Sequence, residues 1–146
     1  MGFLTSDIIS SDAVQIVPNA TLYHFGVLTS NVHMAWMRTV AGRLEMRYRY
    51  SKEIVYNTFP WCNPTAEQKK KIEKTAQAIL DARKLYSDCS FAEMYGEKMY
   101  LFSQLLQAHR ENDRAVMQAY GFPVKNDFTE SMCVAELMKM YQKMIK

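Results

Sequence analysis

The stretch Tyr-Asn-Thr-Phe-Pro-Trp-Cys-Asn-Pro-Thr-Ala-Glu-Gln, residues 56–68, decides how this chain is divided. A run of β-favouring residues over 52–59 ends at two prolines, Pro60 and Pro64. Each proline lacks a backbone donor and pushes the residue before it out of the α region. The sequence therefore predicts an extended run, then a stiff extended strap, and then the start of a helix.

Apolar residues at helical spacing predict three helices after this strap. The first begins at Thr65, which fits a capping box with Gln68, and runs to about Tyr86. The second ends at Gly121, and Thr129 caps the third. The residues expected to face inward in the third helix are Val134, Leu137, Met138, Tyr141 and Ile145. Three helices joined by short loops are expected to pack as an antiparallel bundle.

The part before the strap predicts a smaller layer. The first twenty residues alternate short apolar runs with Ser, Thr and Asp, which indicates short strands and turns. Residues 22–40 follow as one amphipathic helix, with Gly42 as its C-cap. Residues 43–59 mix aromatic, β-branched and charged residues and predict a strand or strand-like strap. The expected fold is mainly α: an antiparallel helical bundle of about three helices after a proline-rich strap, preceded by a smaller α+β remnant with one helix and short strands.

Composition excludes several classes of protein. A chain of 146 residues with 49% hydrophobic residues supports one ordinary core. Cys62, Cys89 and Cys133 lie far apart, which argues against a zinc ribbon and a disulfide framework. No apolar run is long enough for a membrane span, and no signal peptide is indicated. A cytoplasmic protein without a membrane partner is expected.

Positive charge is concentrated just before the strap. The window of residues 38–52 carries one acid, Glu45, against five cations. These cations are Arg38, Arg43, Arg47, Arg49 and Lys52. The whole chain has a formal charge of only +3, so the rest of it is close to neutral. Such a cluster is compatible with contacts to a phosphate backbone, although a solvated face is the more frequent explanation.

Glu45 and Arg47 suggest a more specific chemistry. If this segment is extended, Glu45, Arg47 and Arg49 share one side, opposite Leu44 and Tyr48. An arginine can donate to guanine O6 and N7 in the major groove, and a glutamate can accept from the cytosine amino group. The alternative is a surface ion pair between Glu45 and Arg47, worth under about 1 kcal/mol. Spacing alone favours the ion pair.

The chain carries none of the common catalytic motifs. Gly-x-Ser-x-Gly, the phosphate-binding loop and Gly-x-Gly-x-x-Gly are all absent. His109 lies four residues before Asp113, which is expected to hold its ring as a packing interaction. No nucleophile, base and orienting group come together in the sequence.

Several strings agree in order and spacing with a known family. They are IVPNATLYHFGVLTS (16–30), HMAW (33–36), GRL (42–44), YRYS (48–51), YNTFPW (56–61), AQAILDAR (76–83), AHR (108–110) and DRAV (113–116). Together they resemble the C-terminal region of the large single-chain adenine-specific DNA methyltransferases of the MmeI type, which combine restriction and modification. The resemblance covers most of the chain.

The resemblance implies a domain division and a parent reaction. Residues 1–62 look like the end of a target-recognition domain, and residues 63–146 look like the C-terminal helical domain. The parent would transfer a methyl group from S-adenosylmethionine to adenine N6. Its Asn-Pro-Pro-aromatic motif is absent here, because Asn63-Pro64 is followed by Thr65. The resemblance thus implies a non-catalytic fragment without a cofactor of its own, whose partners are double-stranded DNA and the methyltransferase and remaining recognition domain of the parent.

The resemblance also bears on the charged segment. Glu45 and Arg47 occupy positions that vary in pairs among similar sequences, according to the base pair that is read. The resemblance therefore gives base reading the same weight as the ion-pair interpretation. Arg43, Arg49 and Lys52 are then candidates for phosphate contacts. The alternative function is a purely structural helical module that packs the recognition domain against the catalytic domain without touching DNA.

Overall fold

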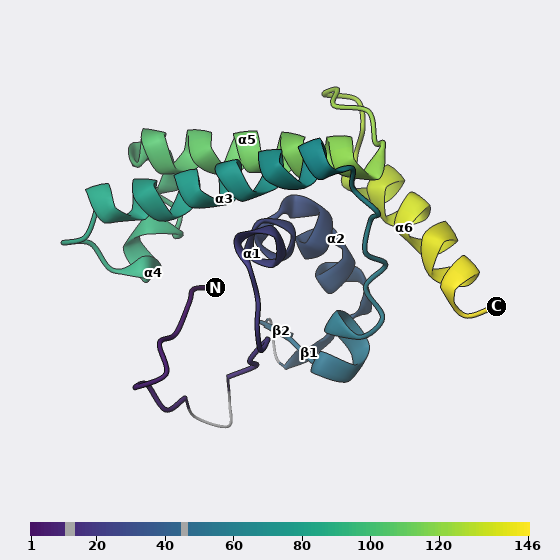
Figure 1. Ribbon diagram of the computed structural model, residues 1–146, viewed down its shortest axis with the longest axis horizontal. Helices are drawn as coiled ribbons and strands as arrows, with labels where there is room; N and C mark the ends of the chain where they lie inside the picture. The colour runs from purple at the N-terminus through teal and green to yellow at the C-terminus, as the bar shows by residue number, and fades with distance from the viewer. Residues whose placement is uncertain (11–13, 45–46) are drawn as a thin grey trace.

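The computed structural model describes residues 1–10, 14–44 and 47–146, with the backbone alone for the strand residues 42–44 and 47–49. The helices and strands are α1 (Leu22–Thr29), α2 (Asn31–Val40), β1 (Gly42–Leu44), β2 (Arg47–Arg49), the π-helix η1 (Lys52–Tyr56), α3 (Ala66–Leu85), α4 (Phe91–Met94), the 3₁₀ helix η2 (Met99–Leu101), α5 (Ser103–Tyr120) and α6 (Glu130–Met144). The prediction of a mainly α fold is confirmed (Figure 1).

The predicted ends of the long helices are also confirmed. Thr65 and Gln68 form the capping box of α3: each backbone N–H donates to the other's side-chain oxygen, at 3.0 and 3.2 Å. Gly121 ends α5 with a φ of 75°, a conformation that glycine adopts without strain. The Thr129 hydroxyl accepts from the Met132 N–H at the start of α6. Leu137 of α6 is fully buried, whereas Ile145, directly after α6, is exposed, so the prediction that Ile145 faces inward is wrong.

The single helix predicted over residues 22–40 is wrong, because the chain breaks at Ser30. Its backbone is extended there, with a ψ of 158°, and its hydroxyl accepts from the His33 N–H as the N-cap of α2. The same hydroxyl donates to the Val27 carbonyl at the end of α1, at 2.6 Å. One buried serine thus closes α1 and opens α2 in a new direction. Gly42 starts β1 instead of capping α2.

The strand-like stretch predicted over residues 43–59 is also corrected. Its first part is an antiparallel hairpin of β1 and β2, and residues 52–56 form a π-helical turn. The Ser51 hydroxyl caps this turn by accepting from the Ile54 N–H. β-propensity does not include such a hydrogen bond, so it predicted a strand here. Residues 57–65 contain no regular secondary structure, and Phe59 and Pro60 in this segment are buried. The described part of residues 1–20 contains none of the short strands predicted there.

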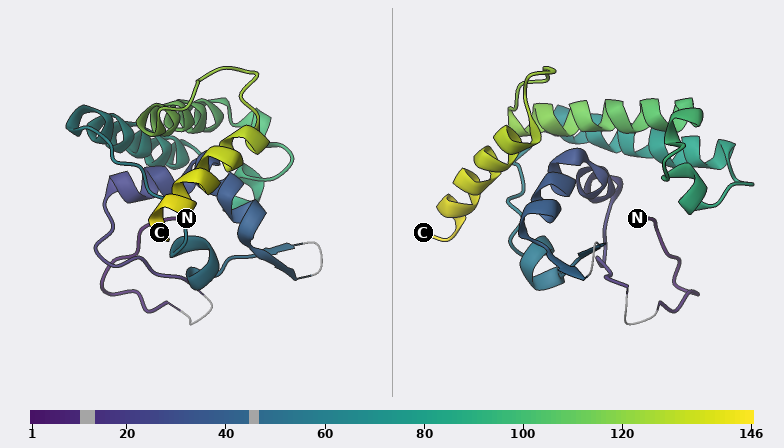
Figure 2. Two further views of the ribbon diagram at one scale, coloured as in Figure 1. Left: turned by 90° about the vertical axis from the view of Figure 1, so that its right-hand side faces the viewer. Right: turned by 180° about the vertical axis from the view of Figure 1, so that it is seen from behind.

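The helices form two layers (Figures 1 and 2). α3 and α5 run antiparallel along one side of the molecule, and α1 packs against both. α6 leaves the end of α5 and packs on α2, so the third neighbour of the α3–α5 pair is α1 and not the last helix. The β1–β2 hairpin lies on the far side of α1 and α2 from this pair. The helical pair therefore supports α1 and α2, which in turn support the hairpin.

Gly26 makes the close contact between α1 and the pair possible. A Cβ atom at this position would lie 2.6 Å from Cγ2 of Ile72 and 3.2 Å from Cβ of Ala76, both on α3. Ile72 and Ala76 are themselves fully buried, so neither side chain can move away. A glycine is therefore required where α1 crosses α3.

Candidate nucleic-acid interface

The hairpin gathers the cationic positions singled out in the sequence. Its register pairs Gly42 with Arg49, Arg43 with Tyr48, and Leu44 with Arg47. Positions 43, 47 and 49 thus lie in one two-stranded ribbon, since paired strands run less than about 5 Å apart. A two-stranded ribbon of this kind fits the major groove of B-DNA. Glu45 lies outside the described residues, as do the side chains of the three arginines.

Lys52 follows the hairpin at the start of η1. Its side chain is exposed, three residues after the last strand residue. Ile54 on the same turn is half exposed, whereas Val55 is fully buried and fixes the turn to the core. Lys52 is thus free in solvent at the base of the hairpin, at a fixed place on the molecule.

A hydrogen bond from α2 holds the base of the hairpin. Nε2 of His33 lies 3.1 Å from the hydroxyl of Tyr50, the residue directly after β2. His33 is 1% exposed, and its ring meets that of Phe59 edge-on at 4.6 Å. Burial lowers the pKa of His33 to about 4, so the imidazole is neutral at pH 7. A second bond, from Trp36 Nε1 to the Thr58 hydroxyl, ties α2 to the segment after η1.

Two consecutive residues of α5 hold the α1–α2 corner in place. Asn112 is fully buried and donates to the Gly26 carbonyl at 2.8 Å. Asp113 accepts from the backbone N–H and from the side-chain amide of Asn31, both at 2.8 Å. Burial raises the pKa of Asp113 to about 6, and the hydrogen bond from the Asn31 N–H lowers this pKa by a smaller amount. This pair fixes the direction in which α2, and with it the hairpin, leaves the helical support.

The expected pairing of His109 with Asp113 is wrong, because Asp113 is taken by Asn31. Nε2 of His109 lies instead 2.7 Å from the hydroxyl of Tyr95, which also accepts from Nε of Arg83. Burial, with the nearby Arg83 charge, lowers the pKa of His109 to about 4. His109 is thus a neutral packing residue, as the sequence indicated, although with a different partner.

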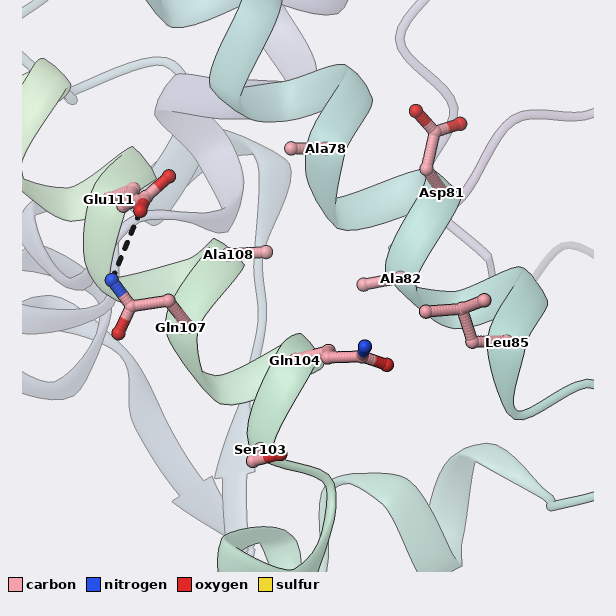
Figure 3. Close-up of a pocket in the computed structure, with 9 residues that line it drawn as sticks. All are labelled: Ala78, Asp81, Ala82, Leu85, Ser103, Gln104, Gln107, Ala108 and Glu111. Atoms are coloured by element: carbon pink, nitrogen blue, oxygen red, sulfur yellow. Dashed lines mark hydrogen bonds between the residues drawn. The ribbon is translucent and has the colours of Figure 1, made fainter.

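A shallow pocket of about 720 Å³ lies between α3 and α5 (Figure 3). It is lined by Ala78, Asp81, Ala82, Leu85, Ser103, Gln104, Gln107, Ala108 and Glu111. Its charged groups are two carboxylates, and the Glu111 carboxylate accepts from Gln107 at 3.0 Å. With negative charge and no lining cation, this pocket does not suit a nucleic-acid phosphate. The hairpin is the better candidate site.

The described part of the chain offers no other evident site. Across residues 1–10, 14–44 and 47–146, no three His, Cys, Asp or Glu side chains gather in a way that would hold a metal ion. Within the same ranges, no helix combines the length and hydropathy needed to cross a lipid bilayer.

Comparison with known proteins gives the class to which this architecture belongs. The family model of the MmeI target recognition domain matches residues 1–63, and that of the MmeI C-terminal domain matches residues 64–146. The chain thus joins a target-recognition region to a C-terminal domain, the arrangement of the MmeI family.

Two individual proteins agree with this class. DNA methyltransferase A of Bacillus subtilis (strain 168) is 35% identical over 144 residues, which are 99% of this chain and 16% of the relative. The solved structure of the type IIL restriction-modification enzyme MmeI in complex with DNA is 48% identical, with a TM-score of 0.80. That match covers 88% of this chain and 17% of the MmeI chain. The chain belongs to the MmeI family, and it spans about a sixth of the length of these relatives.

Proposed function

We propose that this chain is a DNA-recognition and scaffolding part of a longer, S-adenosylmethionine-dependent DNA adenine-N6 methyltransferase of the restriction-modification type. Residues 1–62 complete the target-recognition domain, and residues 63–146 form the C-terminal helical domain. The family matches to residues 1–63 and 64–146 support this division to within one residue. The catalytic motif and the cofactor site belong to the rest of the polypeptide, since the sequence here lacks the Asn-Pro-Pro-aromatic motif.

The hairpin is the observation that carries the proposal. Its register brings three arginine positions into one ribbon, on the side of α1 and α2 away from the helical pair. The related MmeI enzyme was solved in complex with DNA. In this proposal Glu45 and Arg47 read a base pair, and Arg43, Arg49 and Lys52 contact phosphates. Their roles divide recognition into a sequence-specific part and a positioning part.

Loss of affinity with salt tests the phosphate contacts. Fluorescence anisotropy would follow binding of the 146-residue chain to a labelled DNA duplex between about 50 and about 200 mM salt. Three phosphate contacts predict a slope of log K against log salt concentration of about −3. Replacement of Arg43, Arg49 and Lys52 by Ala should weaken binding and bring the slope close to zero.

A charge-matched control separates these contacts from net charge. Lys84, Lys98 and Lys143 are exposed and lie on α3, before η2 and on α6. Their joint replacement by Ala removes the same charge and should leave the affinity and the slope nearly unchanged. An equal effect of both triple variants would contradict the assignment of the phosphate contacts to the hairpin.

The second candidate function is a purely structural one. The buried α1–α3 contact around Gly26 favours it, because this contact joins the recognition part to the helical part through the core. Under this alternative the chain packs the recognition domain against the catalytic domain and does not touch DNA. Absence of binding at the lowest salt concentration, repeated with the full-length enzyme, would favour the structural function.

A further inference from the structure

His33 is a buried histidine that uses only one of its two ring nitrogens. Nε2 bonds with the Tyr50 hydroxyl, whereas Nδ1 is buried without a partner among the described residues. The residue is 1% exposed, and its ring meets edge-on the ring of Phe59, a member of the buried apolar cluster.

A histidine in this state lowers the stability of the core. A buried polar atom without a hydrogen bond destabilises the folded state, whereas an apolar side chain of similar size at the same place carries no such cost. Packing alone therefore does not account for a histidine at position 33. Among the residues that the structure describes, the bond to Tyr50 is the one interaction of the ring that an apolar side chain would not supply.

Tyr50 lies where that bond has an effect on the hairpin. It follows Arg49, the last residue of β2, and precedes Ser51, which caps η1. Its ring is partly buried against the same core as α2. A hydrogen bond at this position selects one orientation of the strand that leaves the core, because hydrogen bonds depend steeply on distance and angle.

We propose that His33 is a positioning residue for DNA recognition, which fixes the base of the β1–β2 hairpin through the Tyr50 hydroxyl. The inference rests on the proposed function of the hairpin as the DNA-contacting element. It adds a residue that touches no DNA but sets the direction from which Arg47 and Arg49 approach it. The unpaired Nδ1 lowers the stability of the fold, whereas the Nε2–Tyr50 bond fixes the orientation of the hairpin base.

Stability and hairpin order should respond in opposite directions when His33 is replaced. His33→Leu removes the buried unpaired nitrogen, so the midpoint of urea unfolding should stay constant or rise. Hydrogen exchange at the backbone amides of residues 42–44 and 47–49 should become at least about fivefold faster, because one net hydrogen bond is lost there. Amides of α3 and α5 should exchange as before. A purely structural residue would instead lower the global stability and the hairpin protection together.

A second pair of variants guards against a failure of His33→Leu to fold. Tyr50→Phe keeps the ring and removes only the hydroxyl, and it should give the same faster exchange in the hairpin. Tyr56→Phe is the matched control, because the Tyr56 hydroxyl makes no hydrogen bond in the described structure; its hairpin amides should match those of the wild-type chain. His33→Gln, whose side-chain amide reaches about as far as Nε2, should restore most of the protection.

DNA affinity completes the test. His33→Leu and Tyr50→Phe should bind a DNA duplex at least about threefold more weakly than the wild-type chain and Tyr56→Phe, since a looser hairpin must be ordered on binding. His33→Gln should recover the affinity. Unchanged hairpin exchange in both His33→Leu and Tyr50→Phe would overturn the inference, as would faster exchange without any loss of affinity. If the wild-type chain and the full-length enzyme do not bind DNA, the proposed function fails, while the exchange data still decide whether His33 fixes the hairpin.

Discussion

Replacement of Asn112 by Ala tests whether α5 holds the α1–α2 corner. The amide donates to the Gly26 carbonyl at 2.8 Å and accepts from the Thr75 hydroxyl at 2.9 Å. Gly26 lies in the last turn of α1, where helical carbonyls lack intrahelical partners, so its oxygen would be left unsatisfied at a cost of about 1 to 3 kcal/mol. Thr75 loses less, because its hydroxyl also lies 3.0 Å from the Ile72 carbonyl.

The cavity left by the amide adds to this loss. Removal of a fully buried group of this size costs about 1 kcal/mol. The free energy of unfolding should therefore fall by about 2 to 4 kcal/mol in Asn112→Ala. Urea unfolding followed by circular dichroism would measure it. Asn112→Leu fills the space without the hydrogen bonds and should recover only the cavity contribution.

Asn126→Ala is the control, because Asn126 is exposed in the loop before α6. Its effect should stay within about 0.5 kcal/mol. A loss in Asn112→Ala of less than about 1 kcal/mol would refute the reasoning, since one unsatisfied buried carbonyl alone accounts for that much. The Asn112 amide would then not be what secures α1 against α5.

Three further predictions concern the same support. Gly26→Ala should destabilise the fold by about 1 to 3 kcal/mol in urea unfolding, despite its better helix propensity, because the new Cβ would lie 2.6 Å from Ile72; no loss would contradict the close contact. The pKa of Asp113 is raised to about 6 in the folded state, so its contribution to stability is present below about pH 4 and is lost as the pH rises to about 6. The free energy of unfolding of Asp113→Asn, relative to the wild-type protein, should therefore increase by about 2 to 3 kcal/mol over this range; a constant difference would contradict the raised pKa. Glu130→Gln breaks an ion pair with Arg38 whose side chains are 34% and 52% exposed, so the loss should be under about 1 kcal/mol and should shrink in high salt; a larger, salt-independent loss would contradict a surface pair.

The helical part of the fold could be predicted because its signals are local. Thr65, Gly121 and Thr129 each fix one helix end through bonds to residues within a few positions of themselves. The break at Ser30 was missed because apolar spacing continues across it, and only the fold shows that its hydroxyl serves both helices. The π-helical turn was missed because β-propensity reports side-chain fit to a sheet and not the cap at Ser51.

The candidate site could be predicted only where its signal is local in the sequence. Charge pattern alone pointed to five cations, Arg38, Arg43, Arg47, Arg49 and Lys52, and the hairpin then placed three of these five positions in one ribbon. His33 was missed, since its partner Tyr50 lies seventeen residues away, between β2 and η1. Asn112 left a readable signal: it is an amide at a position of α5 where helical spacing from Leu105 and Ala108 calls for an apolar residue.

Sequence patterns could not predict which helix α6 packs on. The apolar face of α6 indicates that the helix is partly buried but not which neighbour it meets. Short loops favoured a place beside α3 and α5, whereas α6 packs on α2 and is joined to it by the Arg38–Glu130 pair. As a result, the C-terminal helices contact the recognition part at two places: α3 and α5 pack on α1, and α6 packs on α2.

The central claim is that the hairpin reads DNA while the helices hold it in place. Exchange of the charge pair in the full-length enzyme, by Glu45→Lys together with Arg47→Asp, tests this most directly. Methylated adenines would be mapped at single-base resolution on genomic DNA. The account predicts a change of specificity at one base pair of the target, with the rest of the site retained. An active enzyme whose methylated sites are unchanged would contradict it.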